Sequence, residues 1–535
     1  MDTSDIPVLI AGGGPAGLTL AITLGQLGVE CEVVDARPAP TRVPRAERCG
    51  SRAMEIFRQL GISGRLRAAG LPGEASLDVV TCAGSLARQL ERHRYPSVSD
   101  MLATMLDVND GTMPLEPPAI ISQYTLEPIL REVAEATAGV TVRFGAELID
   151  YAAAGGGVTA MVHTSSRLRT IRADYLVGCD GADSTVRRVL GIEVRGEIRP
   201  PERQALIYCP DLYERLPGGR AIEYHIVGEH PCTLIVQDDT QHFALHAPMS
   251  GPPLATVFEA VAGAVAQPLG YKVVHEGEWP QHLLLADRYG NDGRVFLAGD
   301  AAHAMPPWIG QGMSAGVRDA ANLCWKLAAV LRGQAPDSLL DSYQTERKPH
   351  VTTVTRRAVR NGRVITERRK ALAFLRNHVL RNLTRLPGVL GAAQKLIWIP
   401  AAHYPGGFFA GERHEAVGWQ LPQPRVTDAA GEKLRLDDAL GARWTVLHIG
   451  AAPVGAERWE QLGAGSLAVR GGAGAGAIRD DDGTLTRWLR SRKAAAVVVR
   501  PDGFIYAAAD AGRPLPPPPT GLTELSAPIR IGVTA

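Results

Sequence analysis

The sequence predicts an α/β protein with a parallel sheet of the βαβ type, an inserted antiparallel sheet and a separate C-terminal α/β unit. Three observations predict this fold class. A strand, a glycine-rich turn and a helix open the chain, and two later strands also end at Gly and Asp. The strand-like runs between those two strands lack the strand–helix alternation, and 535 residues are too many for one hydrophobic core.

The N-terminal unit reads as strand, turn, helix and strand. PVLIA (residues 7–11) predicts a strand, GGGPAG (12–17) a turn, LTLAITLGQLG a helix, and CEVVD (31–35) a second strand. Gly12 permits a tight turn, Gly14 lets the backbone approach a pyrophosphate, and Gly17 lets the helix pack on the strand. Asp35 follows at the spacing of a carboxylate that accepts from a ribose hydroxyl, so we expect a Rossmann-like dinucleotide site.

Two further strands end in the same way. YLVGCDG (175–181) runs into Asp180 and Gly181, and RVFLAGD (294–300) runs into Asp300. Because the carboxyl ends of parallel strands meet at one edge of a sheet, we expect a ligand at this edge.

The segment GDAAHAMPPWIGQGMSAGVRDAANL follows the last of these strands and predicts a helix that begins near Gly312. A helix start leaves backbone N–H groups unpaired, so it suits a negative or electron-rich group. Apolar residues then recur at helical spacing until Gly333 and Pro336, and Arg- and Leu-rich helical sequence continues to about residue 400.

The domain boundaries follow from these patterns. The parallel sheet is expected over 1–190 and 285–400, and AIEYHIV, TLIVQ and HFALHAP predict an antiparallel sheet over 80–115 and 190–285. Residues 401–535 form the C-terminal unit, with strands at WTVLHIG and AAAVVVRPDGFIYAA and a stiff connection at RPLPPPP.

Composition excludes several classes of protein. A net charge of +1 argues against nucleic acid or a membrane as the main partner, and no apolar run approaches ~18 residues. The N-terminus lacks a basic segment before an apolar one, and the seven scattered cysteines suggest reduced thiols, so a cytoplasmic location is expected. No His/Cys cluster has metal-ligand spacing, so we expect no metal.

Three motifs in order carry a family resemblance. GGGPAG, CDGADSTVRRVLG and the segment at 299–323, with PRAERCGSRAMEIFRQLG and ISQYTLEPIL, resemble the single-component FAD-dependent aromatic hydroxylases over about residues 6–395. The phenol- and hydroxyphenylpropionate-hydroxylase branch is the most similar, with polyketide hydroxylases nearby. RLDDALGARWTVLHIG and VVVRPDGFI resemble the thioredoxin-like domain of that branch. No cysteine follows Cys324, so this domain lacks dithiol chemistry, and a structural or subunit-contact role suits a homodimer.

The resemblance implies a set of FAD contacts. The Asp300 carboxylate would take ribityl or pyrophosphate-side hydroxyls, and the amides at the helix start would face the flavin pyrimidine and hold the negative charge of the reduced ring. Arg45 would meet phosphate or the ring edge and Gln123 the ribityl chain, unless both are ordinary surface residues. Asp180 and Gly181 are either flavin and nicotinamide contacts or a common turn. The full set is Gly12, Gly14, Ala16, Gly17, Asp35, Arg45, Gln123, Asp180, Gly181, Asp300, Gly312, Met313 and Ser314.

The resemblance also implies hydroxylation of a phenolic ring by NAD(P)H and dioxygen through a flavin hydroperoxide, with nicotinamide bound in a surface cleft. No second glycine fingerprint is present, and no basic cluster selects NADPH over NADH. Tyr224 and His225 in the inserted sheet are candidates for phenol binding and deprotonation, with His246 and Tyr289 as further candidates. Each such residue is more often a packing or surface residue. Pro307 is a candidate backbone contact on the substrate side, unless Pro306–Pro307 only ends the strand; His303 either caps the turn or touches flavin.

Other functions stay open at this point. Baeyer–Villiger oxygenation or hydroxylation of a polyketide-type aromatic keeps the flavin and changes the substrate. Halogenation is disfavoured, because LIWIP at 396–400 holds only the second half of the W-x-W-x-I-P motif. A flavin-binding protein or redox sensor without turnover is the remaining alternative.

Overall fold

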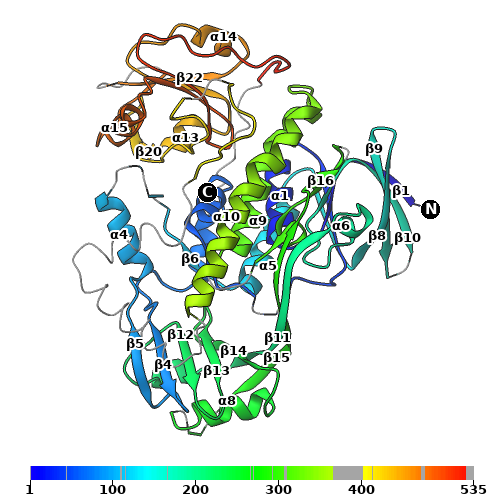
Figure 1. Ribbon diagram of the computed structural model, residues 1–535, viewed down its shortest axis with the longest axis vertical. Helices are drawn as coiled ribbons and strands as arrows, with labels where there is room; N and C mark the ends of the chain where they lie inside the picture. Colours follow the sequence, from blue (N-terminus) through cyan, green and yellow to red (C-terminus); the bar gives the residue numbers. More distant parts are fainter. Residues whose placement is uncertain are drawn as a thin grey trace.

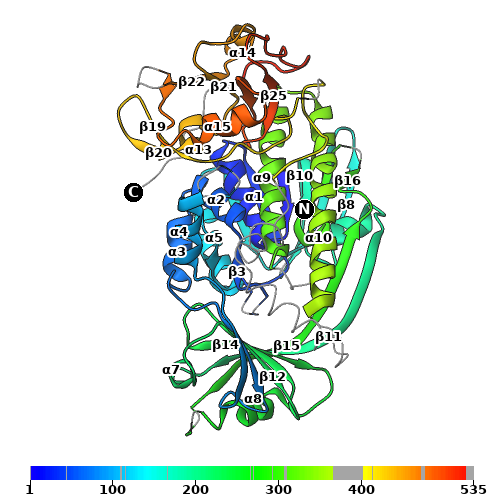
Figure 2. The ribbon, with the colours of Figure 1, turned by 60° about the vertical axis from the view of Figure 1, so that its left-hand side comes forward.

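The computed structural model describes residues 2–525 except 42, 44, 109–110, 112, 115, 166, 266, 269, 292, 306–309, 366–401, 412–413 and 471–475. Pro307, the LIWIP segment and the expected helical sequence at 366–400 lie outside the described residues. Figures 1 and 2 show three parts along the long axis: a central unit, a large sheet below it and the C-terminal unit above it.

The central sheet has the strand order β16-β17-β10-β1-β2-β7, with β8 and β9 continuing from β10. β1 pairs in parallel with β2 and β10, and β10 pairs in parallel with β17. The three strands predicted to end at Gly and Asp therefore do lie in one parallel sheet. Its strands are β1 (Asp2–Ala11), β2 (Cys31–Asp35), β7 (Val140–Phe144), β8 (Ala146–Ala154), β9 (Gly157–Thr164), β10 (Leu168–Gly178), β16 (Gly290–Asn291) and β17 (Val295–Leu297).

Helices cover this sheet, and α9 runs through the middle of the molecule (Figure 2). The helix predicted near Gly312 is confirmed, and it is buried on all sides, including its polar residues Arg318, Asp319, Asn322 and Lys326. α1 starts earlier than predicted, because Pro15 suits the first turn of a helix. The elements are α1 (Pro15–Gln26), α2 (Ser51–Gln59), α3 (Ser63–Ala69), α5 (Gln123–Ala136), α6 (Thr185–Val189), α9 (Gly312–Leu331) and α10 (Asp341–Ile365), with the short strands β3 (Arg48–Cys49) and β6 (Ala119–Ile120) and the 3-10 turns Gly299–Ala301 and Asp337–Leu340.

The lower sheet has the order β18-β15-β11-β14-β13-β12-β4-β5. AIEYHIV, TLIVQ and HFALHAP form its antiparallel strands as predicted, but β4 joins β12 in parallel, so the sheet is mixed. Residues 98–108, expected to join this sheet, form a helix instead. The elements are β4 (Val79–Ala83), β5 (Gln89–His93), β11 (Val194–Tyr208), β12 (Glu223–Val227), β13 (Cys232–Val236), β14 (His242–Pro248), β15 (Lys272–Ala286), β18 (His303–Ala304), α4 (Val98–Val108), α7 (Leu212–Arg215) and α8 (Leu254–Ala262).

The C-terminal unit has a five-stranded mixed sheet of order β23-β22-β21-β24-β25. WTVLHIG forms β21 and AAAVVVRPDGFIYAA forms the β24–β25 hairpin, as predicted. The elements are β19 (Arg425–Thr427), β20 (Lys433–Arg435), β21 (Thr445–Ile449), β22 (Gly465–Val469), β23 (Ala477–Ile478), β24 (Ala496–Val499), β25 (Ile505–Ala509), α13 (Leu436–Leu440), α14 (Ala456–Gln461) and α15 (Thr484–Ser491).

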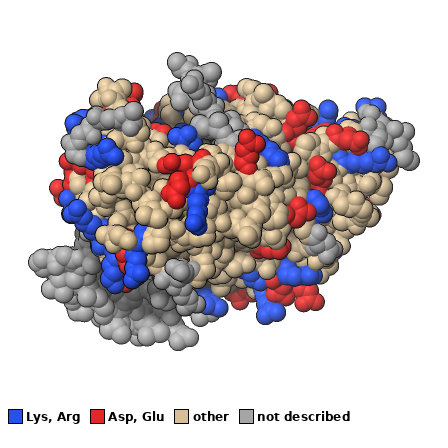
Figure 3. All heavy atoms as spheres, turned by 90° about the horizontal axis from the view of Figure 1, so that it is seen from above, with Lys and Arg blue, Asp and Glu red and all other residues tan. Residues whose placement is uncertain are grey.

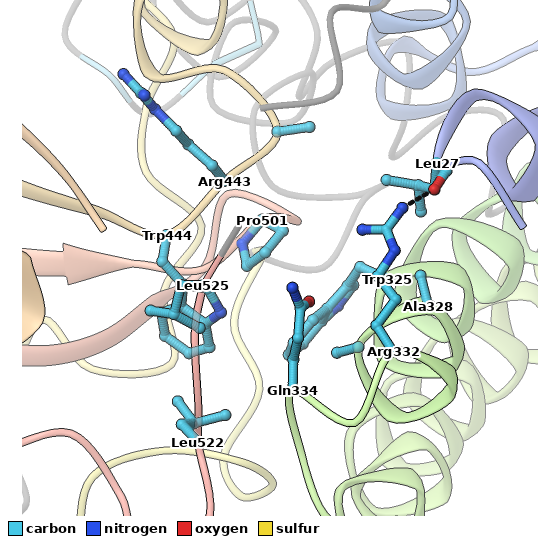
Figure 4. Close-up of a pocket in the computed structure, with 12 residues that line it drawn as sticks. Leu27, Trp325, Ala328, Arg332, Gln334, Arg443, Trp444, Pro501, Leu522 and Leu525 are labelled. Carbon is cyan, nitrogen blue, oxygen red and sulfur yellow. Dashed lines mark hydrogen bonds between the residues drawn. The ribbon is translucent and has the colours of Figure 1, made fainter. Parts of the chain in front are cut away.

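This unit is packed closely on the last turns of α9. The rings of Trp325 and Trp444 meet edge to face with centroids 6.0 Å apart. Arg332 donates to the carbonyl of Leu27 beside them, and only a small cavity of about 60 Å³ is left between the two units (Figure 4). The contact is therefore an extension of the protein core rather than a loose tether.

Exposed charges of both signs are interspersed on the face shown in Figure 3, with no large area of one sign. Six of the seven cysteines are buried and Cys179 is half-buried, and none forms a disulfide. Within the described ranges, no helix combines the length and apolar character that spanning a membrane requires.

Candidate functional site

The glycine-rich turn joins β1 to α1 at the carboxyl edge of the central sheet. Gly12 has a φ of +109°, and a Cβ there would lie 2.3 Å from the carbonyl oxygen of Cys179. A Cβ on Gly17 would lie 2.0 Å from the carbonyl oxygen of Gly12. Both positions therefore require glycine for the fold itself, as the sequence pattern indicated.

Gly17→Ala is expected to destabilise the apoprotein by roughly 3 kcal/mol, because the new methyl group would overlap a backbone carbonyl that cannot move freely. Urea unfolding of the apoprotein measures the change. Gly64→Ala in α3 is the control, since a Cβ there meets nothing within 4 Å. Equal stability of Gly17→Ala and wild type would contradict the close packing described here.

Gly14 differs from these two glycines. A Cβ built on it meets nothing within 4 Å, and its φ of −81° and ψ of −177° suit any residue. It is the N-cap of α1, which has no side-chain cap and no acidic residue in its first turn. The open space thus lies where the unpaired amides of α1 attract an anion.

Asp35 ends β2 and is nearly buried. Its Oδ2 accepts from the Gly13 amide at 2.7 Å and from Nη2 of Arg37 at 2.9 Å, and its Oδ1 accepts from the Arg37 amide and Nε. The ribose contact expected of Asp35 stays a prediction. Sequence analysis did not single out Arg37, although it lies two residues after the end of β2 and Asp35 holds its side chain at the carboxyl edge of the central sheet.

Glu127 of α5 holds the loop that follows Arg37. This fully buried carboxylate accepts from Arg37 Nη1 at 3.1 Å, from the Thr41 amide at 2.9 Å and from Gln123 Nε2 at 2.6 Å. The Gln123 amide donates to the carbonyl of Ala46, which brings Gln123 next to the segment that carries Arg45. Arg45 and Gln123, two predicted FAD contacts that are far apart in the sequence, are therefore neighbours in the fold.

Asp300 lies in the 3-10 turn after β17. A Cβ on Gly299 would lie 3.1 Å from the Cβ of Ala16, so this turn touches the start of α1. The Asp300 side chain is solvent-accessible, but the protein atoms around it partly desolvate the carboxylate. This desolvation raises the pKa of Asp300, although the positive charges of His303 and Arg45 oppose the shift. It has no hydrogen-bond partner among the described residues. A free carboxylate in such surroundings suits a hydroxyl-bearing ligand.

A buried network supports the turn from below. Asp319 of α9 accepts from the Gly299 amide at 3.0 Å and from His303 Nε2 at 2.5 Å through one oxygen, and from Arg347 Nε at 2.7 Å through the other. His303 therefore stabilises the turn through Asp319, in line with the first of its two predicted roles, capping the turn or touching flavin. Its Nδ1 is buried without a partner, so a flavin contact stays a prediction.

The start of α9 is the second uncapped helix N-terminus here. Gln311 is the N-cap and makes no side-chain cap, no acidic residue lies in the first turn, and a Cβ on Gly312 would meet nothing within 4 Å. Met313 is partly buried in the core beside α2, and Ser314 Oγ accepts from the Gly50 amide at 3.0 Å. The Ser314 hydroxyl therefore binds the segment before α2 as an acceptor, and the Ser314 backbone amide belongs to the uncapped first turn of α9.

Asp180 is placed differently from Asp300. Its carboxylate accepts from Ser184 Oγ at 2.5 Å and from the Val186 amide at 3.0 Å, so it caps the start of α6. Gly181 has a φ of +84°, which a turn here requires. The turn alternative accounts for both residues, and their cofactor contacts stay a prediction.

Tyr224 and His225 were both candidates for phenol binding, and the structure places them on opposite faces of the sheet, with Tyr224 in the core as a packing residue. Adjacent residues on a strand point to opposite faces of the sheet. Tyr224 is fully buried in the core against α8, and its hydroxyl accepts from the Ala221 amide at 3.0 Å. His225 lies on the other face, with Nε2 3.0 Å from Glu223 and Nδ1 3.2 Å from Thr233.

His225 shares its face with Glu223 and His246, and this face is opposite Glu47 and Arg48 of the central unit. Burial raises the pKa of Glu47 to about 7, and the charge of Glu223 adds to this shift. Burial lowers the pKa of His246 to about 4, although Glu223 opposes it. Both ring nitrogens of His246 are buried without a partner in the part of the chain that the structure describes, whereas both nitrogens of His225 are occupied.

This second group lies next to the start of α9. A Cβ on Gly310, two residues before α9, would lie 3.9 Å from the Cβ of Arg48. Sequence reasoning missed Glu47, Arg48 and Glu223. Glu223 joins His225 and His246 on one face only through the register of β12 on β13 and of β13 on β14, and Glu47 and Arg48 come from the central unit opposite this face. The alternation of polar and apolar residues in EYHIV was the available signal.

The arrangement fits FAD. Open space at Gly14, the free Asp300 carboxylate and the uncapped start of α9 follow one another along one edge of the sheet, as a pyrophosphate, a ribityl chain and an electron-rich ring require. The sheet face that carries Glu223, His225 and His246 lies next to the end of this edge at the start of α9, where the ring would bind.

Comparisons with known proteins agree with this fit. Residues 5–239 and 258–358 match the family model described as FAD binding domain, and residues 418–514 match the HcaD C-terminal domain. The 3-(3-hydroxy-phenyl)propionate/3-hydroxycinnamic acid hydroxylase of Escherichia coli O139:H28 (strain E24377A / ETEC) is 28% identical over 537 residues, covering 94% of this chain and 92% of the relative. Its counterpart in Mycobacterium sp. (strain JLS) is also 28% identical, covering 96% of this chain and 90% of the relative.

Solved structures are similar over nearly the whole chain. The flavin-dependent monooxygenase PieE in complex with FAD and substrate has a TM-score of 0.77 at 25% identity, covering 94% of this chain and 95% of that one. RebC soaked with K252c has a TM-score of 0.77 at 28% identity, covering 95% and 96%. Aklavinone-11 hydroxylase with FAD and aklavinone has a TM-score of 0.76 at 27% identity, covering 96% and 98%.

Proposed function

Because the chain belongs to the family of FAD-dependent aromatic hydroxylases, we propose that it hydroxylates a phenolic ring with FAD, NAD(P)H and dioxygen. The observation that carries the proposal is the free carboxylate of Asp300 between two uncapped helix starts, those of α1 and α9. When bound, FAD supplies the hydride acceptance and oxygen activation that no side chain here can provide.

The residues of the chain have the task of binding and polarising. Amides at the start of α1 would hold the pyrophosphate beside Gly14, and Asp300 would hold ribityl hydroxyls. Backbone amides of Gly312, Met313 and Ser314 would face the pyrimidine edge, where the positive end of the α9 dipole favours negative charge on the ring. Gln123, which Glu127 holds, and Arg45, which precedes the Ala46 carbonyl bound by the Gln123 backbone amide, would close the outer side.

The sheet face of His246 is the proposed substrate side. With its pKa lowered to about 4, His246 is neutral near pH 7, and one ring nitrogen then carries a lone pair for a phenol O–H. His225 is less suited to this contact, since Glu223 and Thr233 occupy its two nitrogens. Glu223 and Arg48 would fix the charge around the ring rather than touch the hydroxyl.

Two substrate classes come from the relatives. One relative acts on hydroxyphenylpropionate and hydroxycinnamic acid by its name, and another was solved with the polycyclic aklavinone. The test is NAD(P)H oxidation stimulated by simple phenols, hydroxyphenyl acids and polycyclic phenols, with isotope-labelled dioxygen traced into the product. We expect one labelled oxygen on an aromatic carbon. A lactone product would establish Baeyer–Villiger chemistry instead, and flavin-loaded protein without oxidation of NAD(P)H would favour a binding role.

His246→Phe tests the substrate side. The ring keeps its place against Trp279, whose centroid lies 5.2 Å away, but the nitrogens are lost. We expect the KM for the phenol to rise about tenfold, the value of one hydrogen bond of about 1.4 kcal/mol, with unchanged FAD content. Steady-state kinetics with the best phenol of the screen measure the change.

Tyr224→Phe is the matched control, because its hydroxyl serves only the Ala221 amide in the core behind the sheet. Its kinetics should equal wild type. A larger kinetic defect in Tyr224→Phe than in His246→Phe would overturn the assignment of the two faces.

We also propose that the C-terminal unit is thioredoxin-like. Its central β21 pairs in parallel with β22 and antiparallel with β24, and helices flank this mixed sheet, which supports the assignment. No cysteine lies in this unit, so we infer a structural or subunit-contact role rather than dithiol chemistry.

A further inference from the structure

The C-terminal unit is joined to α10 by a buried ion pair. Arg500 donates to both carboxylate oxygens of Glu346, at 2.7 and 2.9 Å, and neither side chain is exposed. The same carboxylate accepts from Asn322 at 2.7 Å and Lys326 at 2.9 Å in α9 and from the Phe408 amide at 2.9 Å. One residue of α10 thus binds α9 and the C-terminal unit at once.

The next residue of α10 connects to the cofactor edge. Arg347 donates through Nε to Asp319 at 2.7 Å, and Asp319 in turn holds the Gly299 amide at 3.0 Å. Gly299 directly precedes Asp300. Glu346 and Arg347 are consecutive in a helix, so a shift at one displaces the other.

A second contact leads to the same arginine. The Tyr404 hydroxyl accepts from Arg347 Nη1 at 3.3 Å, and the Tyr404 ring stacks on Phe504 of the C-terminal unit with centroids 4.2 Å apart. Two separate sets of contacts from the C-terminal unit therefore lead to Arg347, which supports the Gly299–Asp300 turn through Asp319.

We propose that the C-terminal unit is a positioning element of the cofactor site, acting through Glu346 and Arg347 on the turn that carries Asp300. The inference rests on the proposed place of FAD at Asp300. It gives a cysteine-free domain a task in the active enzyme: Arg500 fixes α10, and α10 fixes the carboxylate that meets the ribityl chain. The coupling between two sites is reciprocal. Because docking of the C-terminal unit favours FAD binding, bound FAD must also stabilise the docked C-terminal unit.

The first experiment compares two arginines of the same interface. Arg500→Lys removes the two-pronged contact with Glu346, whereas Arg58→Lys weakens the pairing of α2 with Asp437 and Asp438, which does not lead to Asp300. Apoprotein is titrated with FAD by flavin fluorescence. We expect at least a tenfold rise in Kd for Arg500→Lys and less than a twofold rise for Arg58→Lys. Equal shifts would mean that general docking is responsible and would overturn the proposal.

A double-mutant cycle separates positioning from loss of stability. In an Asp300→Ala background, Arg500→Lys should change the FAD Kd less than twofold, because the contact through which it acts is absent. Fully multiplicative effects would contradict the proposal. If wild type itself fails to bind FAD, the proposed function fails; if wild type binds and Arg500→Lys binds equally well, only this inference fails.

A measurement on wild type covers the case in which Arg500→Lys does not fold. Addition of FAD to the apoprotein should slow amide hydrogen exchange at least tenfold in β24 and β25, which flank Arg500 and Phe504. Unchanged exchange in these strands, with slower exchange confined to α1 and α9, would contradict the coupling.

Discussion

Gly14→Val is expected to yield a folded protein that has lost FAD. The backbone at Gly14 already has dihedral angles that valine adopts, and the space beyond its Cα is open. The new side chain would fill the place proposed for the pyrophosphate and keep it away from the α1 amides. We expect the FAD Kd to rise at least 100-fold, or about 2.7 kcal/mol, and the melting temperature of the apoprotein to stay within about 2 °C of wild type.

The combination of the two measurements is what makes this variant informative. Gly64→Val is the control, since it adds the same side chain to open space in α3 far from the turn. It should bind FAD as wild type does. Wild-type FAD affinity in Gly14→Val would remove the cofactor from this turn, whereas an unfolded Gly14→Val would contradict the open space described for it.

Asp300→Ala is the second variant with a large expected effect. A carboxylate that holds ribityl hydroxyls contributes roughly 1.5–3 kcal/mol, so FAD affinity should fall about 10- to 100-fold and purified protein should contain little flavin. Desolvation raises the pKa of Asp300, which means that its charged form is disfavoured in the folded apoprotein. Its removal should therefore leave the melting temperature of the apoprotein unchanged or higher.

Asp300→Asn provides the graded comparison. The amide keeps one acceptor oxygen of the same size, so its FAD affinity should lie between that of wild type and Asp300→Ala. Flavin content at the wild-type level in Asp300→Ala would show that this carboxylate holds no part of the cofactor. A lower melting temperature of the Asp300→Ala apoprotein would instead place Asp300 in the structural network with Asp319.

Local patterns were enough to predict the parallel sheet and the start of α9 near Gly312, whereas α1 starts at Pro15, earlier than predicted. Gly12 follows β1 and Gly299 follows β17 because the turns after these strands need a positive φ, at +109° for Gly12 and +60° for Gly299. The sequence predicted that part of residues 80–115 joins the lower sheet, but it did not predict that residues 79–83 pair with β12 in parallel. Only long-range packing decides such a pairing.

Side-chain roles in the site were predicted less well than backbone roles. Tyr224 and His225 were both candidates for the substrate side, but the two-residue period of a strand places them on opposite faces. Asp319 and Glu346 were not singled out from the sequence, although both are buried charges on long helices. Such residues are buried only when partners from other segments of the chain neutralise them, and Arg347 and Arg500 do so here.

A crystal structure of the protein loaded with FAD tests the central claim most directly. It should place the pyrimidine edge of the isoalloxazine about 3 Å from the amides of Gly312, Met313 or Ser314, with the pyrophosphate beside Gly14. A ring bound elsewhere, or flavin-loaded protein with no density at the start of α9, would contradict the account.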